Sequence, residues 1–284
     1  MHSDASGDLQ VSSKKREIKL FFLRLGFWRK MRATDMSNSP VIEKVSQERW
    51  QEAQEWERHH WVRTQQLRAR YCKNLLWRLL ASAGLVPKHR GDDWNVWWRT
   101  QFADYDFLPA QVENAIEVGC GPYTNVRLML DRCRVRHLVL SDPLIRTYVH
   151  FKLTFVAEMY RKAACILDDH PLEELPFAPG FFDLAVMINV LDHVQDAERC
   201  MRNLVNVTKP GGILIIGQDL TDEEDLKALQ HDPGAPGHPI KLDHEWFEPL
   251  LQGFQPLVKK VLNREQSREP HQHYGALIFA GRKR

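Results

Sequence analysis

The 284-residue sequence lacks the marks of several protein classes. No apolar run approaches the roughly 20 residues that a membrane-spanning helix requires. Lys and Arg number 39 against 37 Asp and Glu, so no basic face large enough for nucleic acid is indicated. The few cysteines form no C-x-x-C pair and no zinc-type spacing, which favours a reduced, cytoplasmic chain; they are Cys72, Cys120, Cys133, Cys165 and Cys200.

An apolar content of 43% supports a substantial core, and the length suits one large domain with an extension. We expect three parts. Residues 1–38 are a basic, flexible tail, residues 39–111 are a helical and aromatic cap, and residues 112–284 are the main domain. The sequence does not predict an oligomeric state.

The basic stretch 14–32 places apolar residues at helical spacing, which is typical of a helix lying on an anionic membrane surface. A solvated tail, or sequence ahead of a start at Met36, is the favoured alternative. A signal peptide is not expected, because charges interrupt the apolar part and no small-residue cleavage site follows. The partner prediction for this stretch is therefore, at most, a weak membrane contact.

Residues 41–85 have helical periodicity, and Ser39-Pro40 is suited to open the helix. Leucines and a tyrosine form one apolar stripe, namely Leu67, Tyr71, Leu75 and Leu79, with Leu76 and Leu80 beside it. We expect these helices to pack on the main domain. A sharper interpretation is that these helices cover a substrate pocket. For the aromatic cluster from Trp94 to Phe107, packing in the core is the favoured interpretation, and lining of a pocket is the alternative.

The stretch 115–125 organises the main domain. A short apolar strand ends in Gly119-Cys120-Gly121, where small residues let the backbone turn sharply beside a ligand. Thr124 or Asn125 is expected to cap the helix that follows, whose first N–H groups face the turn. Glu117 lies inside the strand, and a buried carboxylate requires a ligand or a neighbouring donor.

Residues 117–121, Glu-Val-Gly-Cys-Gly, resemble motif I of class I S-adenosylmethionine (SAM)-dependent methyltransferases. The resemblance implies an α/β fold: a Rossmann-like, seven-stranded, mostly parallel sheet with an antiparallel last strand, helices on both faces, and here an N-terminal helical extension. It implies SAM as cofactor, with Glu117 ordering the loop and helping to hold the methionine end of SAM. Gly119, Cys120 and Gly121 form the cofactor turn, with Cys120 as a small filler.

A second match covers residues 182–194, which are similar to the fourth strand and following turn of small-molecule methyltransferases of type 11. Asn189 ends that strand, beside the expected sulfonium. Residues 209–216, Lys-Pro-Gly-Gly-Ile-Leu-Ile-Ile, resemble the fifth-strand motif. The resemblance covers about residues 115 to 218 well and the rest weakly.

Further cofactor contacts are expected at the ends of the next strands. Asp142 stands roughly 20 residues past the glycine turn, where Rossmann-type folds place the ribose-binding acid. Pro143, with Leu144, is expected against the adenine. A helix over residues 145–162 and a strand over 164–167 lead to Asp168-Asp169, and the family resemblance implies that one of this pair takes the adenine amino group.

The two least regular stretches are the loops 219–244 and 264–273, which we call the mouth loops. They are expected to meet at the carboxyl edge of the sheet and to set acceptor specificity. The second loop joins strands predicted at 256–262 and 274–280. Arg264 and Arg268 suit an anionic acceptor, but a solvated hairpin rim is the favoured interpretation.

His193 is the first candidate for a catalytic base, because it follows the fourth strand closely; a histidine that packs at a helix start is the equal alternative. His238 and His271 are further catalytic candidates on the mouth loops, with His273 beside them. Asp142, Asp192 and His193 alone do not make a metal site, so no metal is predicted, although the mouth loops could complete one.

The function predicted is SAM-dependent methyl transfer to an oxygen or nitrogen of a small molecule or a sugar/glycan precursor. The first alternative is an NAD-type oxidoreductase or epimerase, against which the missing third glycine at Thr124 argues. The second is a non-catalytic module that binds SAM and meets a partner.

Overall fold

The computed structural model describes residues 41–82, 93–151, 154–221, 235–268 and 275–284. By its internal contacts the chain divides into residues 1–39 and residues 40–284, and every element described below belongs to the second unit. The tail predicted at 1–38, with its membrane contact, lies outside the described residues. Among the helices that are described, none is long and apolar enough to cross a membrane.

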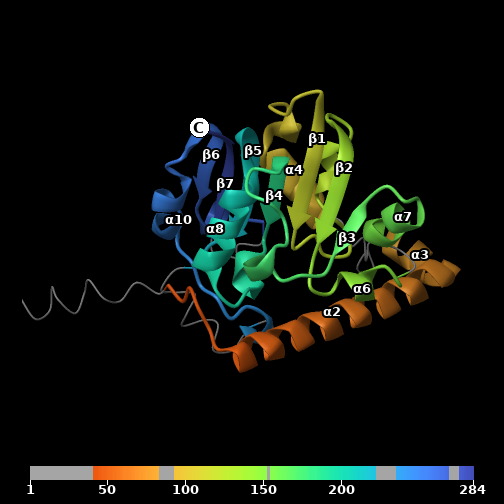
Figure 1. Ribbon diagram of the computed structural model, residues 1–284. Helices are drawn as coiled ribbons and strands as arrows, with labels where there is room; N and C mark the ends of the chain where they lie inside the picture. Colours follow the sequence, from red (N-terminus) through yellow and green to blue (C-terminus); the bar gives the residue numbers. More distant parts are fainter. Residues whose placement is uncertain (1–40, 83–92, 152–153, 222–234, 269–274) are drawn as a thin grey trace, which may run out of the picture. The chain divides into compact units, whose positions relative to one another are not determined.

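The described residues form one seven-stranded sheet in the order β3-β2-β1-β4-β5-β7-β6 (Figure 1). All neighbouring pairs are parallel except those of β7, which runs antiparallel to both β5 and β6. The fold class predicted from the sequence is therefore confirmed. The strands are β1 (Gln111–Val118), β2 (Arg134–Ser141), β3 (Ile166–Asp168), β4 (Phe182–Ile188), β5 (Thr208–Asp219), β6 (Phe254–Leu262) and β7 (Ala276–Lys283).

Helices cover both faces of the sheet, and each face has its own hydrophobic core. One core is formed with α8 (Ala197–Val207) and α10 (His244–Leu251), and the other with α4 (Asp93–Gln101), α5 (Val126–Met129), α6 (Ile145–Tyr148) and α7 (Phe155–Arg161). Two further helices, α2 (Gln47–Lys73) and α3 (Leu75–Ser82), precede the sheet in the chain. Short 3₁₀ turns complete the described elements: η1 (Ala103–Tyr105), η2 (Leu172–Glu174), η3 (Leu191–His193), η5 (Ala235–Gly237) and η6 (Arg264–Gln266).

Helix α8 shows how local sequence sets an element. The Asp196 carboxylate accepts a hydrogen bond from the Arg199 backbone N–H at 3.0 Å, which satisfies a donor at the helix start. Buried side chains then recur at helical spacing, namely Ala197, Cys200, Met201, Leu204 and Val207. This apolar stripe lies against β4 and β5 and places the turn after β4 at the edge of the sheet.

Helix α4 packs on β5 through one close contact. A Cβ atom placed on Gly217 would lie 2.8 Å from two ring carbons of Trp98, so only glycine permits this approach. Trp98 is fully buried together with Phe102 and Tyr105, which follow it in the chain. For this part of the aromatic cluster, packing is the role that the structure shows.

Two expected helix boundaries were wrong. The first helix begins at Gln47, after Ser46, whose Oγ accepts from the Arg49 N–H; Ile42 and Lys44 instead form β-bridges with Lys241 and Asp196. The helix predicted over 145–162 is two helices, because Thr154 caps a new start at Phe155.

Helix α2 contacts the main domain as predicted, but not through the leucine stripe. Leu75, Leu76 and Leu79 are 66%, 65% and 60% exposed, and Leu67 is 40% exposed. These side chains therefore do not pack on the main domain. The helix predicted at 222–229 lies outside the described residues.

Candidate cofactor and acceptor site

The carboxylate of Glu117 organises the glycine loop from inside β1. It accepts hydrogen bonds from the Thr124 hydroxyl, from the Asn125 backbone N–H at 2.7 Å and from the Val126 N–H at 3.0 Å. Burial raises the pKa of this carboxyl, and the surrounding donors oppose that rise. The start of α5 is thus capped by Glu117 rather than by the side chains of Thr124 or Asn125, which corrects the expected cap.

The two glycines of the loop have different physical roles. A Cβ on Gly119 would lie 2.5 Å from the Val190 side chain, so the loop touches the residue just before η3. Gly121 has a φ of +55° and nothing within 4 Å of a Cβ built on it. The side of the loop at Gly121 is therefore open to a ligand, while the side at Gly119 is packed. Between them, Cys120 is buried, and burial raises the pKa of its thiol well above the ordinary value, which suits a filler and not a nucleophile.

Asp142 follows β2 and lies beside the glycine loop. Its Oδ2 accepts from the Gly121 N–H at 3.0 Å, and its Oδ1 accepts from the Leu144 N–H at 2.8 Å. Burial raises the pKa of Asp142 to about 6, although both hydrogen bonds favour the ionised form. The structure thus brings the predicted ribose acid into direct contact with the predicted cofactor turn, and Pro143 follows it in the chain.

The adjacent acids Asp168 and Asp169 have separate environments. Asp168 ends β3, is buried, and accepts from the Ser141 hydroxyl at 2.7 Å; its other oxygen lies 2.7 Å from His170 Nδ1. Asp169 is exposed and pairs with Arg146 at 2.8 Å. Only Asp168 stands at the sheet edge next to Asp142, so the geometry favours it over Asp169 for a cofactor contact.

Asn189 directly follows β4 and has a φ of +56°, which turns the chain away from the sheet. Its Oδ1 accepts from the Asp219 N–H at 3.1 Å, and its own N–H donates to the Gly217 carbonyl at 2.7 Å. Asn189 therefore ties the carboxyl ends of β4 and β5 together. Its side-chain oxygen is used for this link in the structure.

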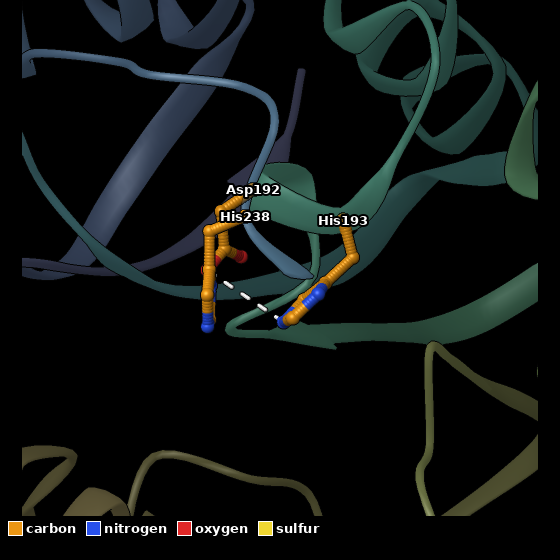
Figure 2. Close-up of side chains that lie close together, drawn as sticks. All are labelled: Asp192, His193 and His238. Atoms are coloured by element: carbon orange, nitrogen blue, oxygen red, sulfur yellow. Dashed lines mark hydrogen bonds and ion pairs between the residues drawn. The ribbon is translucent and has the colours of Figure 1, made fainter. Parts of the chain in front are cut away.

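Three ligand-type side chains meet at the ends of these two strands (Figure 2). We call Asp192, His193 and His238 the acceptor-side cluster. His238 Nδ1 lies 2.6 Å from Asp192 Oδ2, and His193 Nε2 lies 3.6 Å from the same oxygen. The two imidazole rings are 4.4 Å apart between centroids. The structure thus brings together two of the predicted catalytic histidines; His271, with His273, lies outside the described residues.

Charges around His193 set its protonation. Burial disfavours the imidazolium, but the carboxylates of Asp192 and Glu57 outweigh burial and raise the pKa of His193. Burial likewise works against the ionised form of Asp192, yet the two histidines hold the pKa of this carboxyl well below its usual range. The cluster therefore has a field that favours a positive charge within it.

Helix α2 crosses the carboxyl ends of the parallel strands (Figure 1). Gln54 Nε2 donates to the His193 carbonyl at 3.1 Å, and Gln65 Nε2 lies 2.6 Å from the Tyr123 hydroxyl in the glycine loop. The ring of Trp56 packs so closely on Gly237 that a Cβ there would lie 2.4 Å from it. One helix thus contacts both the glycine loop and the acceptor-side cluster, which favours the sharper interpretation that it covers a pocket.

Residue Gln218 was missed in the sequence and is central here. Its Oε1 accepts from the N–H groups of Val190 and Leu191 at 3.2 and 3.0 Å, and its Nε2 donates to Asp192 Oδ1 at 3.1 Å. Gln218 is 1% exposed. The signal that could have found it is an amide at the end of the apolar run of β5, because a buried polar side chain requires partners.

Arg268 corrects part of another expectation. Its side chain is 7% exposed and its Nη2 lies 3.6 Å from Asp219 Oδ2, so Arg268 is not on a solvated rim. Arg264 lies in η6 at the start of the same connection. The stretch 269–273, which completes the predicted mouth loop, lies outside the described residues.

Comparison with known proteins agrees with this geometry. Residues 116–216 match the methyltransferase domain family. Norajmaline N-methyltransferase of Rauvolfia serpentina is 27% identical over 90 residues, which are 32% of this chain and 23% of that enzyme. The alignment thus spans about a quarter of the curated relative's length.

Two solved structures share the fold. The YcgJ protein of Bacillus subtilis has a TM-score of 0.51 and 13% identity, covering 66% of this chain and 99% of that one. A candidate sarcosine dimethylglycine methyltransferase of Galdieria sulphuraria has a TM-score of 0.52 and 11% identity, covering 69% and 88%. The matched residues 116–216 thus form a methyltransferase domain, and the strand order of the sheet is that of the Rossmann-like methyltransferase fold, whose cofactor is SAM.

Proposed function

We propose that this protein binds SAM at the glycine loop and transfers its methyl group to an oxygen or nitrogen of a small molecule or a sugar/glycan precursor. The observation that carries the proposal is the hydrogen bond from the Gly121 N–H to Asp142, within a loop that Glu117 orders. Gly119 of the same loop packs on Val190, two residues before Asp192 of the acceptor-side cluster. Cofactor and acceptor groups thereby share one edge of the sheet, where open α/β folds bind ligands.

The residues at the glycine loop suit an adenosyl ligand. Space beside Gly121 admits close backbone approach, and Asp142 has acceptor capacity left on both oxygens for ribose hydroxyls. The buried Asn125 Oδ1 has no partner among the described residues, which suits a contact with a donor such as the α-ammonium group. In this proposal Asp168 receives the adenine amino group and Pro143 lies against the ring.

When bound, SAM supplies an electrophilic methyl carbon on a sulfonium centre. The chain's part is to hold donor and acceptor in line and to deal with the acceptor's proton. We assign the second task to the acceptor-side cluster, because Asp192 and His193 lie in the turn after β4 and Asp192 is two residues from Val190, which the cofactor loop touches. His271 stays a prediction for this role, and Asn189 acts by fixing the ends of β4 and β5.

A small acceptor is supported by two observations. The near-balanced charge of the chain offers no footprint for nucleic acid. The aligned plant relative is, by its name, an N-methyltransferase of a small molecule.

We place the protein in the cytoplasm. The described cysteines Cys120, Cys133, Cys165 and Cys200 are all free thiols, which suits a reducing compartment.

The test begins with calorimetry of the full chain against S-adenosylhomocysteine and NAD. We expect saturable binding of S-adenosylhomocysteine and none of NAD; the reverse result would sink the proposal and favour an oxidoreductase. Transfer of labelled methyl from SAM to a panel of sugars, nucleotide sugars and amines then separates an enzyme from a non-catalytic SAM-binding module. Binding without transfer to any member of the panel would support the module.

A further inference from the structure

Asp192, His193 and His238 are, by chemistry, a complete set of metal ligands. Among the described residues they are the group whose His nitrogens and carboxylate oxygen all lie within 4.8 Å of one another. Two imidazoles and one carboxylate, with a position left over, are the donor set of catalytic zinc sites. We propose that the acceptor-side cluster binds one zinc-type divalent cation with an open coordination position.

The distances suit the exchange of a proton for a metal ion. Ligand atoms around a tetrahedral zinc stand about 3.3–3.5 Å apart, because each bond is about 2.0–2.2 Å long. His193 Nε2 is already 3.6 Å from Asp192 Oδ2. The 2.6 Å contact between His238 Nδ1 and Asp192 Oδ2 widens by under about 1 Å when the shared proton leaves.

Outer hydrogen bonds fix two of the three ligands for metal binding. His193 Nδ1 lies 2.9 Å from the Gly237 carbonyl oxygen, which holds a proton on Nδ1 and leaves Nε2 as the lone-pair nitrogen facing Asp192. Asp192 Oδ1 accepts from Gln218 Nε2 at 3.1 Å, which leaves Oδ2 for the cation. Such partners orient metal-binding histidines and carboxylates and raise their affinity.

The third ligand comes from a loop that sequence alone could not place. His238 lies 46 residues beyond Asp192 and is brought back by the backbone bond from the Ile240 N–H to the Asp192 carbonyl at 3.3 Å. Trp56 of α2 contacts both Gly237 and the ring of His238. The sequence predicted no metal because only two ligands were adjacent; the mouth loop supplies the one that was missing.

The chemical role rests on the proposed methyl transfer. An acceptor hydroxyl that occupies the open position has its pKa lowered by the cation and releases its proton to solvent water. The oxygen lone pair then forms a bond to the methyl carbon, the carbon–sulfur bond breaks, and its electron pair stays on sulfur as S-adenosylhomocysteine leaves. The products are the methyl ether, S-adenosylhomocysteine and one hydrated proton.

The experiment is calorimetry of Zn²⁺ alone into the full chain after stripping with a chelator. We expect one zinc per chain, binding at least about tenfold weaker in His193→Ala and His238→Ala, and roughly 10–100-fold weaker in Gln218→Leu, which removes an outer partner. His137→Ala is the matched control, since His137 has one carboxylate, Glu113, at 3.6 Å and is half exposed. Equal zinc binding by all variants, or no saturable binding, would overturn the site.

Two further measurements separate loss of the metal site from loss of the fold or of the cofactor site. Co²⁺ in place of Zn²⁺ should give the visible absorption of a four- or five-coordinate site in the wild type and in His137→Ala, and lose it in His238→Asn, which keeps a side chain of similar shape. S-adenosylhomocysteine affinity in the same stripped samples should stay unchanged. If the stripped wild type binds S-adenosylhomocysteine but not zinc, the metal site alone is refuted. If it does not bind S-adenosylhomocysteine, the proposed function is refuted.

Discussion

At the scale of single residues, Asp142 is the most direct test of the cofactor site. Replacement by alanine removes the acceptor that we assign to the ribose and leaves the Gly121 and Leu144 N–H groups without a partner. We expect S-adenosylhomocysteine binding to weaken by about 1–3 kcal/mol. Isothermal calorimetry measures this, with Asp169→Ala as control, because Asp169 is exposed and paired to Arg146. Equal affinities for the wild type and Asp142→Ala would move the ribose elsewhere.

The same carboxyl predicts a pH dependence of cofactor affinity. Its pKa is raised from 3.8 to about 6, so it is ionised at pH 7.5 and mostly protonated at pH 5. The protonated form loses acceptor capacity toward the ribose, so affinity should fall as pH drops through 6, by up to about tenfold at pH 5. In Asp142→Asn the profile between pH 5 and 7.5 should be flat. A wild-type profile equally flat would contradict the assignment.

Glu117 is predicted to act on stability as well as on binding. Glu117→Ala leaves the buried donors of Thr124, Asn125 and Val126 without their acceptor, and each such donor costs about 1–3 kcal/mol. Glu117→Gln keeps one carbonyl oxygen and should lose less. Chemical denaturation measures both. Wild-type stability in Glu117→Ala would show that water satisfies this loop instead.

At the scale of elements, the contact between α4 and β5 is predicted to be intolerant of one methyl group. Gly217→Ala forces its Cβ to within 2.8 Å of the Trp98 ring and should destabilise the protein by about 1–3 kcal/mol. Gly253→Ala is the matched control, because nothing lies within 4 Å of a Cβ at that position. Denaturant midpoints compare the two, and equal midpoints would mean that α4 shifts without cost.

Sequence pattern predicted the strands better than the helices, for a physical reason. Buried parallel strands are apolar throughout, and the motifs at Glu117, Asp142 and Asn189 mark their ends. Helices α6 and α7 share one apolar pattern, and the cap at Thr154 divides them. The stripe of Leu75 and Leu79 has helical spacing but is exposed, since periodicity states which residues share a face and not what covers that face.

The acceptor-side cluster was only half visible in the sequence. Asp192 and His193 are adjacent, so their shared place after β4 follows from the chain. His238 reaches them from the mouth loop, Gln218 from β5 and Glu57 from α2, and only the three-dimensional course of the chain brings these together. The residues that a motif carries are thus the ones that we assign to the cofactor, while the acceptor side depends on tertiary contacts.

At the scale of the whole molecule, α2 and the sheet belong to one unit, so we expect one cooperative thermal transition for them. A ligand held between them should raise its midpoint. S-adenosylhomocysteine at about 100 times its dissociation constant adds roughly 2.7 kcal/mol of stability. That corresponds to a rise of roughly 5–10 °C for a protein of this size, measurable by scanning calorimetry. NAD at equal concentration should leave the midpoint where it is, and a rise with NAD would count against the cofactor assignment.

The order of the strands has a consequence for the chain as it is made. The last strand, β7, lies between β5 and β6, and β6 pairs with no other described strand. A nascent polypeptide can therefore assemble β1 to β5 early, but β6 has no edge to join until Ala276–Lys283 has been synthesised. A stop codon at Ala276 would remove eight residues of strand and leave a second strand without a neighbour.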